Sequence, residues 1–294
     1  MMTAQPDYMG LYPLDIHLSN SRPISALQRL WESSDGSLPA LYLAHGAPPT
    51  LDDSLWASEL FAWSQSMPKP RGIVIISAHW EDAPTTISAP GIQRELVYDF
   101  GGFQQRYFDL TYTTPDATSL GQDVKALFEG ETIHEDPKRG LDHGAWVPLM
   151  LMYPLADVPV IQLSMPTHNA DKLMSMGKKL KTLREQGVLI MGSGFITHGL
   201  QFLNRSFFTG EVKGGPGWSR DFDAWAAEAL DNGDIDTLAA FKQKAPGMPY
   251  AHPTVEHYTP LFVTLGASES IDSGVETKIE GFSYGLSKRS FAVR

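Results

Sequence analysis

Four short apolar segments constrain the fold of this chain more than any other feature of its sequence. None of them alternates cleanly between apolar and polar residues; they are LPALYLA (38–44), GIVIISA (72–78), VPVIQLS (158–164) and GVLIMGS (187–193). Strands that are covered on both faces have this composition, because neither face meets water. The four segments therefore predict the buried strands of a parallel or mixed sheet.

Amphipathic segments separate these strands and predict helices on both faces of the sheet. The segments are 24–34, 52–66, 116–130 with Asp116 as N-cap, 169–187, 219–233 and 234–245, while 281–294 predicts a strand or hairpin edge. Alternating strands and helices predict a layered α/β fold, with a central mostly parallel or mixed sheet flanked by helices. We expect one catalytic domain over 38–294 and an N-terminal extension over 1–37 packed on it.

Composition excludes several classes of function. The chain has no cysteine, so disulfides, thiolate metal sites and cysteine nucleophiles are excluded. The net charge of −11 repels phosphate backbones and argues against a nucleic-acid partner. No apolar run approaches the roughly 20 residues of a membrane helix, and the N-terminus lacks a secretory pattern. We therefore expect a cytoplasmic protein without a membrane partner.

Histidines follow three of the four predicted strands. His45 comes directly after the first, His79 directly after the second, and His198 five residues beyond GVLIMGS. In open α/β sheets, ligands bind at the carboxyl ends of the strands. If these strands are parallel, the three imidazoles are expected to converge on one crevice.

A fourth histidine is predicted to face the same way. Pro260 is best tolerated in the first turn of a helix, which places the helix start near His257. At about 100° per residue, His257 then lies about 40° from the apolar stripe, whereas Glu256 lies about 120° away. We expect His257 to point inward, since two adjacent residues cannot both face one metal comfortably.

The remaining histidines differ in their placement. His143, in LDHGAW, precedes a helix-like apolar run. His252 is close to the cluster but precedes a proline. Three others have no comparable placement and are expected to be structural: His17, His134 and His168. Trp80, Trp146 and Phe103 are expected to be packing residues.

The histidines suit a mononuclear non-haem metal, which binds neutral imidazoles and keeps positions open for substrate. His45, His79 and His257 would supply three nitrogen ligands from distant parts of the chain. Neither HExxH nor GxSxG occurs, so the sequence offers no support for zincin or nucleophile-elbow chemistry. GSGFITHG is neither a dinucleotide fingerprint nor a P-loop.

Seven motifs in one order resemble the class III extradiol ring-cleavage dioxygenases, most closely the DOPA-dioxygenase-type branch. This branch is related to the catalytic subunit of protocatechuate 4,5-dioxygenase. The motifs span residues 43 to 261: LAHGAPP, ISAHW, YDFGGF, LDHGAW, PVIQLSM, GSGFITHGL and HPTVEHYTPL. The residues around YDFGGFQQRYF and KGGPGW are candidates for a lid or pocket wall, and Arg94 and Arg106 flank YDFGGF.

The resemblance implies roles at the matching positions. His45, His79 and His257 resemble the metal ligands, and His143 resembles the histidine that contacts substrate oxygen. His198 resembles the catalytic histidine or, in resting zinc forms, an additional ligand. More distant relatives use two histidines and a carboxylate, so Glu256 keeps that alternative open. Fe(II) is implied for ring cleavage, with Zn(II) in a resting or isolated form.

The resulting hypothesis is a metal-dependent extradiol dioxygenase that opens a catechol-type ring with O₂ to a semialdehyde. Its partners are a small aromatic diol and O₂. His198 would act as general base and then acid, since imidazole ordinarily titrates near working pH. Two alternatives stay open from the sequence: a zinc-dependent hydrolase on the same histidines, and a non-catalytic binding protein of the same fold.

Overall fold

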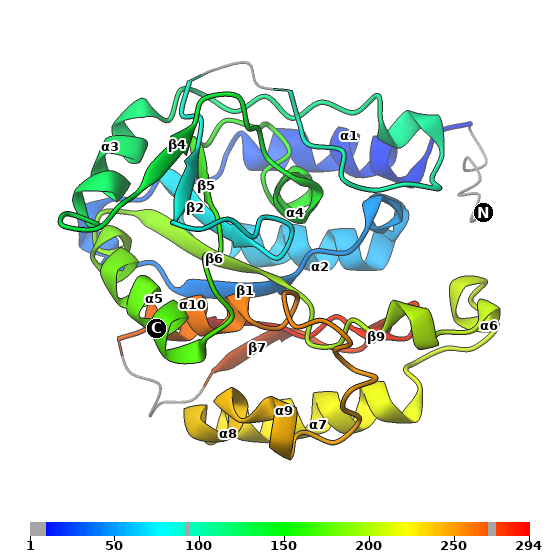
Figure 1. Cartoon of the computed structure of the whole chain (residues 1–294). Helices are drawn as coiled ribbons and strands as arrows, with labels where there is room; N and C mark the ends of the chain where they lie inside the picture. The colour runs from blue at the N-terminus through cyan, green and yellow to red at the C-terminus, as the bar shows by residue number, and fades with distance from the viewer. Residues whose placement is uncertain (1–9, 92–94, 270–274) are drawn as a thin grey trace.

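All four apolar segments form strands at the centre of one sheet. The computed structural model describes residues 10–91, 95–269 and 275–294 (Figure 1). The four strands are β1 (Ala40–Ala44), β2 (Gly72–Ser77), β5 (Val160–Leu163) and β6 (Val188–Gly194). They lie in the order β5-β2-β6-β1, all parallel, and every residue in them is buried. The prediction of a buried sheet of this kind is confirmed.

Shorter strands extend this parallel centre to eight strands and make the sheet mixed. The full order is β4-β3-β5-β2-β6-β1-β10-β7. β3 pairs antiparallel with β5, and β10 pairs antiparallel with β1 and β7. The added strands are β3 (Thr86–Ser88), β4 (His134–Asp136), β7 (Glu276–Ile279) and β10 (Ser290–Val293). The predicted C-terminal strand or hairpin edge comprises β10 and a small hairpin of β8 (Phe282–Ser283) and β9 (Leu286–Ser287).

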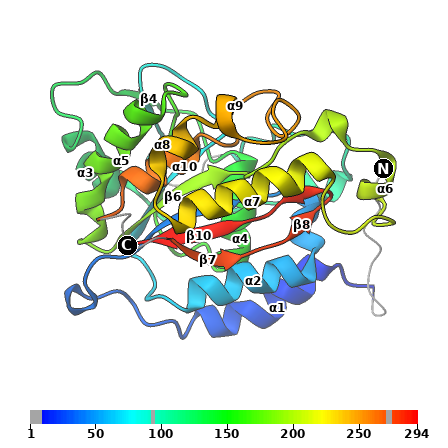
Figure 2. The same cartoon turned by 90° about the horizontal axis from the view of Figure 1, so that it is seen from below.

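Two apolar layers, one on each face, hold the sheet. Along β2, Ile73 and Ile75 face one layer while Val74 and Ile76 face the other. The first layer includes α2 (Ser54–Gln65) and α4 (His143–Met152). The second includes α3 (Thr118–Ala126), α5 (Ala170–Arg184), α7 (Gly217–Asp231) and α10 (Pro260–Gly266). Figures 1 and 2 show these helices on the two sides of the sheet, as the α/β prediction requires.

The N-terminal helix differs from its prediction. The segment 24–34 does not form the expected helix; instead α1 (Pro13–Ser25) precedes it and packs on α2. Pro13 occupies the first helical position, and the Asp15 carboxylate accepts a hydrogen bond from the Tyr12 N–H, so both residues favour a start here. Leu27 and Leu30, within the segment predicted to be helical, are exposed. The division between an extension and a domain at residue 37 stays a prediction, and residues 1–9 lie outside the described residues.

Other helix boundaries shift by a few residues. α5 begins after Asn169, whose side chain accepts from the Lys172 N–H as an N-cap. α3 begins at Thr118 with Ala117 at the cap position and ends at Ala126, so the predicted bounds of 116–130 were too wide. The 234–245 segment divides into α8 (Ile235–Ala239) and α9 (Phe241–Lys244). Short turns complete the chain: α6 (Arg205–Phe208) and the 3-10 helices η1 (Ser33–Asp35), η2 (Pro48–Asp52), η3 (Gln105–Tyr107) and η4 (Leu200–Phe202). Over the described ranges, no helix combines the length and apolarity needed to cross a membrane.

Candidate metal centre

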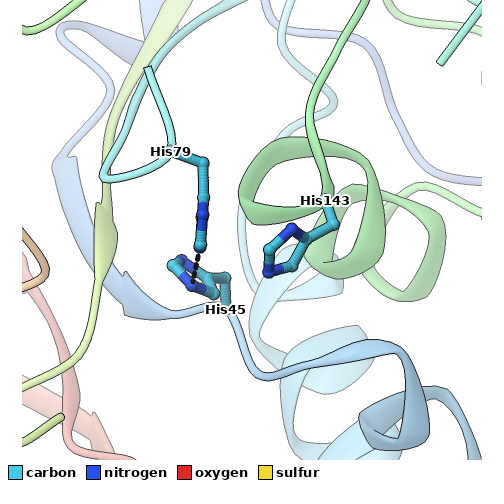
Figure 3. A group of neighbouring side chains, drawn as sticks. All are labelled: His45, His79 and His143. Atoms are coloured by element: carbon cyan, nitrogen blue, oxygen red, sulfur yellow. Dashed lines mark hydrogen bonds between the residues drawn. The ribbon is translucent and has the colours of Figure 1, made fainter. Parts of the chain in front are cut away.

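Parallel strands deliver the predicted histidines to one edge of the sheet. His45 follows β1 directly, His79 follows the end of β2, and His198 lies in the loop after β6. Figure 3 shows His45 and His79 side by side, with His143 facing them from the first turn of α4. The buried strand β2 therefore brings an imidazole to this edge, because His79 lies two residues beyond its last residue, Ser77.

The imidazole nitrogens converge at a spacing that suits one metal ion. The Nε2 atom of His79 lies 3.1 Å from Nε2 of His45 and 3.3 Å from Nε2 of His257. Ligand nitrogens about 2.0–2.1 Å from a metal lie roughly 2.8–3.0 Å apart as neighbours in octahedral geometry and roughly 3.3–3.4 Å apart in tetrahedral geometry. The two spacings measured from Nε2 of His79 are therefore of the size expected for neighbouring ligands of one ion.

The Nδ1 atom of His45 faces a hydrogen-bond acceptor. It lies 3.0 Å from the Ser193 hydroxyl oxygen, and that hydroxyl donates its own proton to the carbonyl of Gly144. Ser193 must then accept from His45, so the His45 ring carries its proton on Nδ1. The lone pair of Nε2 is left pointing at the other histidines.

Carboxylates perform the same task for the other two rings. His257 Nδ1 lies 2.8 Å from Glu256 Oε1, and His79 Nδ1 lies 3.4 Å from Asp99 Oδ2. A histidine that ligates a metal commonly donates its other N–H to a carboxylate or hydroxyl, which fixes the ring and its tautomer. An acceptor therefore lies near the Nδ1 atom of each of the three rings, and their Nε2 atoms face one another.

His257 reaches the centre from a turn, not from a helix. α10 starts at Pro260, so the predicted helix start near His257 was wrong, although His257 is the inward residue and Glu256 lies behind it. The His257 carbonyl accepts hydrogen bonds from the Phe195 N–H and the Tyr42 hydroxyl. An added Cβ at Gly194 would lie 2.0 Å from that carbonyl oxygen, so glycine is what allows the end of β6 to approach.

His143 and His198 complete the cluster. The ring of His143 has its centroid 3.9 Å from that of His79, and its Nδ1 lies 2.7 Å from Asp99 Oδ1. His198 stacks on His257 with 3.4 Å between ring centroids. Two donor groups that share no residue can be drawn, His45–His79–His143 and His198–Glu256–His257, and the three proposed ligands are divided between them. Which of the five histidines ligate and which act on substrate stays a prediction.

Burial keeps the cluster neutral, which is the form that binds metals. Burial and the neighbouring imidazoles hold the pKa of His45 and of His257 well below the ordinary histidine value. Burial, with a smaller effect of His252, lowers the pKa of His198 to about 4. The expectation that His198 titrates near working pH was therefore wrong for the metal-free protein, because the ring is buried among other imidazoles.

The other histidines have partners elsewhere. His17 Nε2 lies 3.1 Å from the Leu151 carbonyl oxygen, and His252 Nε2 lies 2.8 Å from that of Ile196. His168 lies between Glu81 and Thr259, and His134 is an exposed residue of β4. The structural roles of His17, His134 and His168 stay predictions, and His252, whose role was left open, is a buried residue bonded to the backbone.

The YDFGGF segment lies beside the site, and sequence reasoning overlooked its aspartate. Asp99 contacts both His79 and His143, and the Phe100 ring lies edge-on to His143 at 5.7 Å. The signal in the sequence was the position of this aspartate within YDFGGF, one of the motifs that carry the family resemblance. Arg106 pairs with Asp52, and Arg94 lies outside the described residues.

The expected packing residues are aromatic neighbours of this region. Trp146 is fully buried, and Trp80 lies under the guanidinium of Arg139 at 4.4 Å. Phe103 packs near Phe100, with 6.0 Å between ring centroids. Phe100 and Phe103 are partly exposed, so they can form an apolar wall beside His143.

The site consists of imidazoles at the carboxyl edge of a mixed α/β sheet, with the Nε2 atoms of three of them close together. This arrangement is typical of non-haem metal enzymes with nitrogen ligands. Comparison with known proteins identifies the family. Residues 38–293 match the family described as the catalytic LigB subunit of aromatic ring-opening dioxygenase, and the chain belongs to it.

Curated relatives agree over most of their length. The chain is 38% identical to a 4,5-DOPA dioxygenase extradiol of Beta vulgaris, over 80% of this chain and 89% of that protein. It is 32% identical to one of Escherichia coli K12, over 86% and 93% respectively. A crystal structure of an uncharacterized protein from Escherichia coli K12 superposes with a TM-score of 0.72 at 29% identity, covering 87% of this chain and all of that one. The prediction of an extradiol ring-cleaving dioxygenase is confirmed, and with it a metal, an aromatic substrate and O₂.

Proposed function

We propose that this enzyme opens the ring of a DOPA-like catechol, and that His45, His79 and His257 hold Fe(II) for the reaction. The proposal of a DOPA-like substrate is supported by relatives from a plant and a bacterium named 4,5-DOPA dioxygenase extradiol. We further propose that the enzyme acts in the cytoplasm, without nucleic-acid or membrane partners, as its acidic composition favours.

One observation carries the assignment of ligands. Among the residues that the structure describes, His45, His79 and His257 combine two features: each has an Nε2 atom within 3.3 Å of another Nε2 atom of the set, and each has an Nδ1 atom facing an acceptor outside the set. A set of neutral nitrogens held in this way has no simpler chemical use than binding a cation.

The donor set also bears on the choice of metal. Iron(II), when bound, would supply electron exchange between the diol and O₂, which zinc cannot because it has no redox chemistry. Zinc in the same residues would represent a resting or isolated form. Glu256 takes no place among the ligands in this proposal, since its contact is with the outer nitrogen of His257.

Two histidines are left for the substrate. His198 is neutral at pH 7, because burial lowers its pKa to about 4, so it can accept a proton from a diol hydroxyl. His143 donates from Nδ1 to Asp99, which leaves its Nε2 as an acceptor for a substrate hydroxyl. Phe100 and Phe103 would pack against the flat ring and exclude water.

The test is reconstitution with Fe(II) under anaerobic conditions, followed by a panel of catechols and then air. We expect O₂ uptake with one equivalent of a yellow ring-opened product, and the zinc-loaded protein should give neither. Absence of uptake across a broad panel would refute the proposal. Turnover of a substrate by the zinc form without O₂ would favour the hydrolase alternative instead.

A further inference from the structure

We infer that Asp99 is a positioning residue that couples the metal site to the substrate-facing histidine through one carboxylate. The inference rests on the proposed function, in which His79 binds the metal and His143 binds substrate. Asp99 itself would touch neither metal nor substrate.

The contacts of Asp99 divide between the two oxygens of its side chain. Oδ1 lies 2.7 Å from Nδ1 of His143 and accepts from the backbone N–H of the same residue at 3.3 Å. Oδ2 lies 3.4 Å from Nδ1 of His79. One carboxylate therefore contacts a histidine just after β2 and a histidine at the start of α4. These two residues, His79 and His143, are 64 positions apart in the sequence.

The backbone around Asp99 is fixed to the same helix start. The Val97 N–H donates to the Leu141 carbonyl at 2.8 Å, and Val97 pairs with Asp142 as an isolated parallel bridge. The Tyr98 hydroxyl donates to the Leu110 carbonyl at 2.6 Å. The segment that carries Asp99 is therefore held by hydrogen bonds of its own backbone and side chains. The Asp99 side chain is 25% exposed and lies between the imidazoles and solvent.

An ionised carboxylate can only accept hydrogen bonds, so Asp99 decides the tautomer of the His143 ring and favours the same tautomer for His79. His143 must present an N–H at Nδ1, and an N–H on Nδ1 of His79 is the arrangement that the nearby Oδ2 stabilises, so each ring then has a lone pair on Nε2. For His79 that lone pair faces His45 and His257; for His143 it is available to substrate. A single group therefore sets metal affinity and substrate orientation together.

Asparagine at this position separates the tautomer effect from packing. It has nearly the same size as aspartate, but one of its two outer atoms is an NH₂ donor. Only one of the two imidazoles can then keep an acceptor at Nδ1. The other must turn its N–H to Nε2, where it can neither bind a metal nor accept from substrate.

The experiment compares Asp99→Asn with Asp109→Asn. Asp109 is an exposed aspartate ten residues later, whose side chain accepts from Gln105. Cobalt(II) and zinc affinity are measured by chelator competition, and kcat and KM are measured on the iron form. We expect Asp99→Asn to weaken metal affinity or lower kcat by about 10–100-fold, while Asp109→Asn matches the wild type in both.

Wild-type values for Asp99→Asn in both metal affinity and kcat would overturn the inference. A second measurement needs no variant: ¹⁵N NMR of the zinc-loaded wild type should find the ring proton of His143 on Nδ1. A proton on Nε2 of that ring would equally overturn it.

The two hypotheses fail separately. If the wild-type protein binds cobalt and Asp99→Asn binds it more weakly, the positioning role stands even where no catechol is cleaved. If the wild type cleaves a catechol and Asp99→Asn does so equally well with equal metal affinity, the proposed function stands and the role of Asp99 does not.

Discussion

A single methyl group added at Gly144 should disturb the metal site, because it would press on the side of the histidine rings that faces α4. Gly144 lies in the first turn of α4, directly after His143. A Cβ at this position would lie 2.3 Å from the Ser77 hydroxyl oxygen, 3.0 Å from Cδ2 of His79 and 3.2 Å from Nδ1 of His45. All three distances are shorter than the 3.4 Å at which ordinary contacts begin. Gly144→Ala therefore presses on two proposed ligands at once.

The clash cannot be relieved cheaply. Ser77 is completely buried, and its hydroxyl accepts from the backbone N–H of His79, so rotating it away would release the residue it holds. Opening the closest contact to an ordinary distance requires a shift of about 1 Å, whereas metal–ligand distances tolerate about 0.2 Å. Overpacking of this kind costs about 1–3 kcal/mol, and the gain in helix propensity of alanine over glycine offsets about 0.5–1 kcal/mol.

Thermal unfolding and chelator competition measure the two effects. We expect the Tm of metal-free Gly144→Ala to fall by up to about 4 °C and metal affinity to fall at least about tenfold. The matched control is Gly217→Ala in the first turn of α7, where nothing lies within 4 Å of an added Cβ and the Tm should hold or rise. Wild-type Tm and metal affinity for Gly144→Ala would refute the close packing on which this reasoning depends.

Three further predictions test the site. His45→Ala should lose metal on dialysis, whereas His198→Ala should keep the metal and lose turnover. Metal analysis and O₂ uptake measured on the same samples check both expectations. Loss of metal from His198→Ala would show that His198 is a ligand. Glu256→Gln should weaken metal affinity about tenfold by chelator competition, through the His257 ring that Glu256 holds; complete loss would instead indicate a carboxylate ligand. Burial lowers the pKa of His252 to about 4 in the folded protein. Between about pH 4 and about pH 6.5, His252 is therefore protonated in the unfolded chain but neutral in the folded one. Stability of the metal-free protein should then fall by about 1–2 kcal/mol for this residue as pH drops from 7 to 5, and urea unfolding curves that coincide at the two pH values would contradict this.

The sequence could predict the strands and the histidines at their ends because both leave a local signal. β2 is a run of apolar residues that ends two positions before His79, and a ligand site at the ends of parallel strands follows from topology alone. The edge strands left no such signal. β4 and β7 carry mostly exposed or half-buried residues, so their pairing is decided by neighbours that lie far away in sequence.

The groups that hold the imidazoles show where local reasoning ends. A ligand is recognisable by its residue type, but the acceptor at its Nδ1 is defined only by distance in the folded chain. Ser193 belongs to β6, Asp99 to a loop, and Glu256 is the sequence neighbour of His257, so the three partners share no pattern of spacing. Because Glu256 is adjacent to His257 in the sequence, it is a candidate for an alternative ligand. The sequence does not show which nitrogen of the histidine its carboxylate faces. A pattern of histidines therefore predicts that a metal site exists, while its affinity depends on acceptors that become identifiable only once the fold brings them to the outer nitrogens.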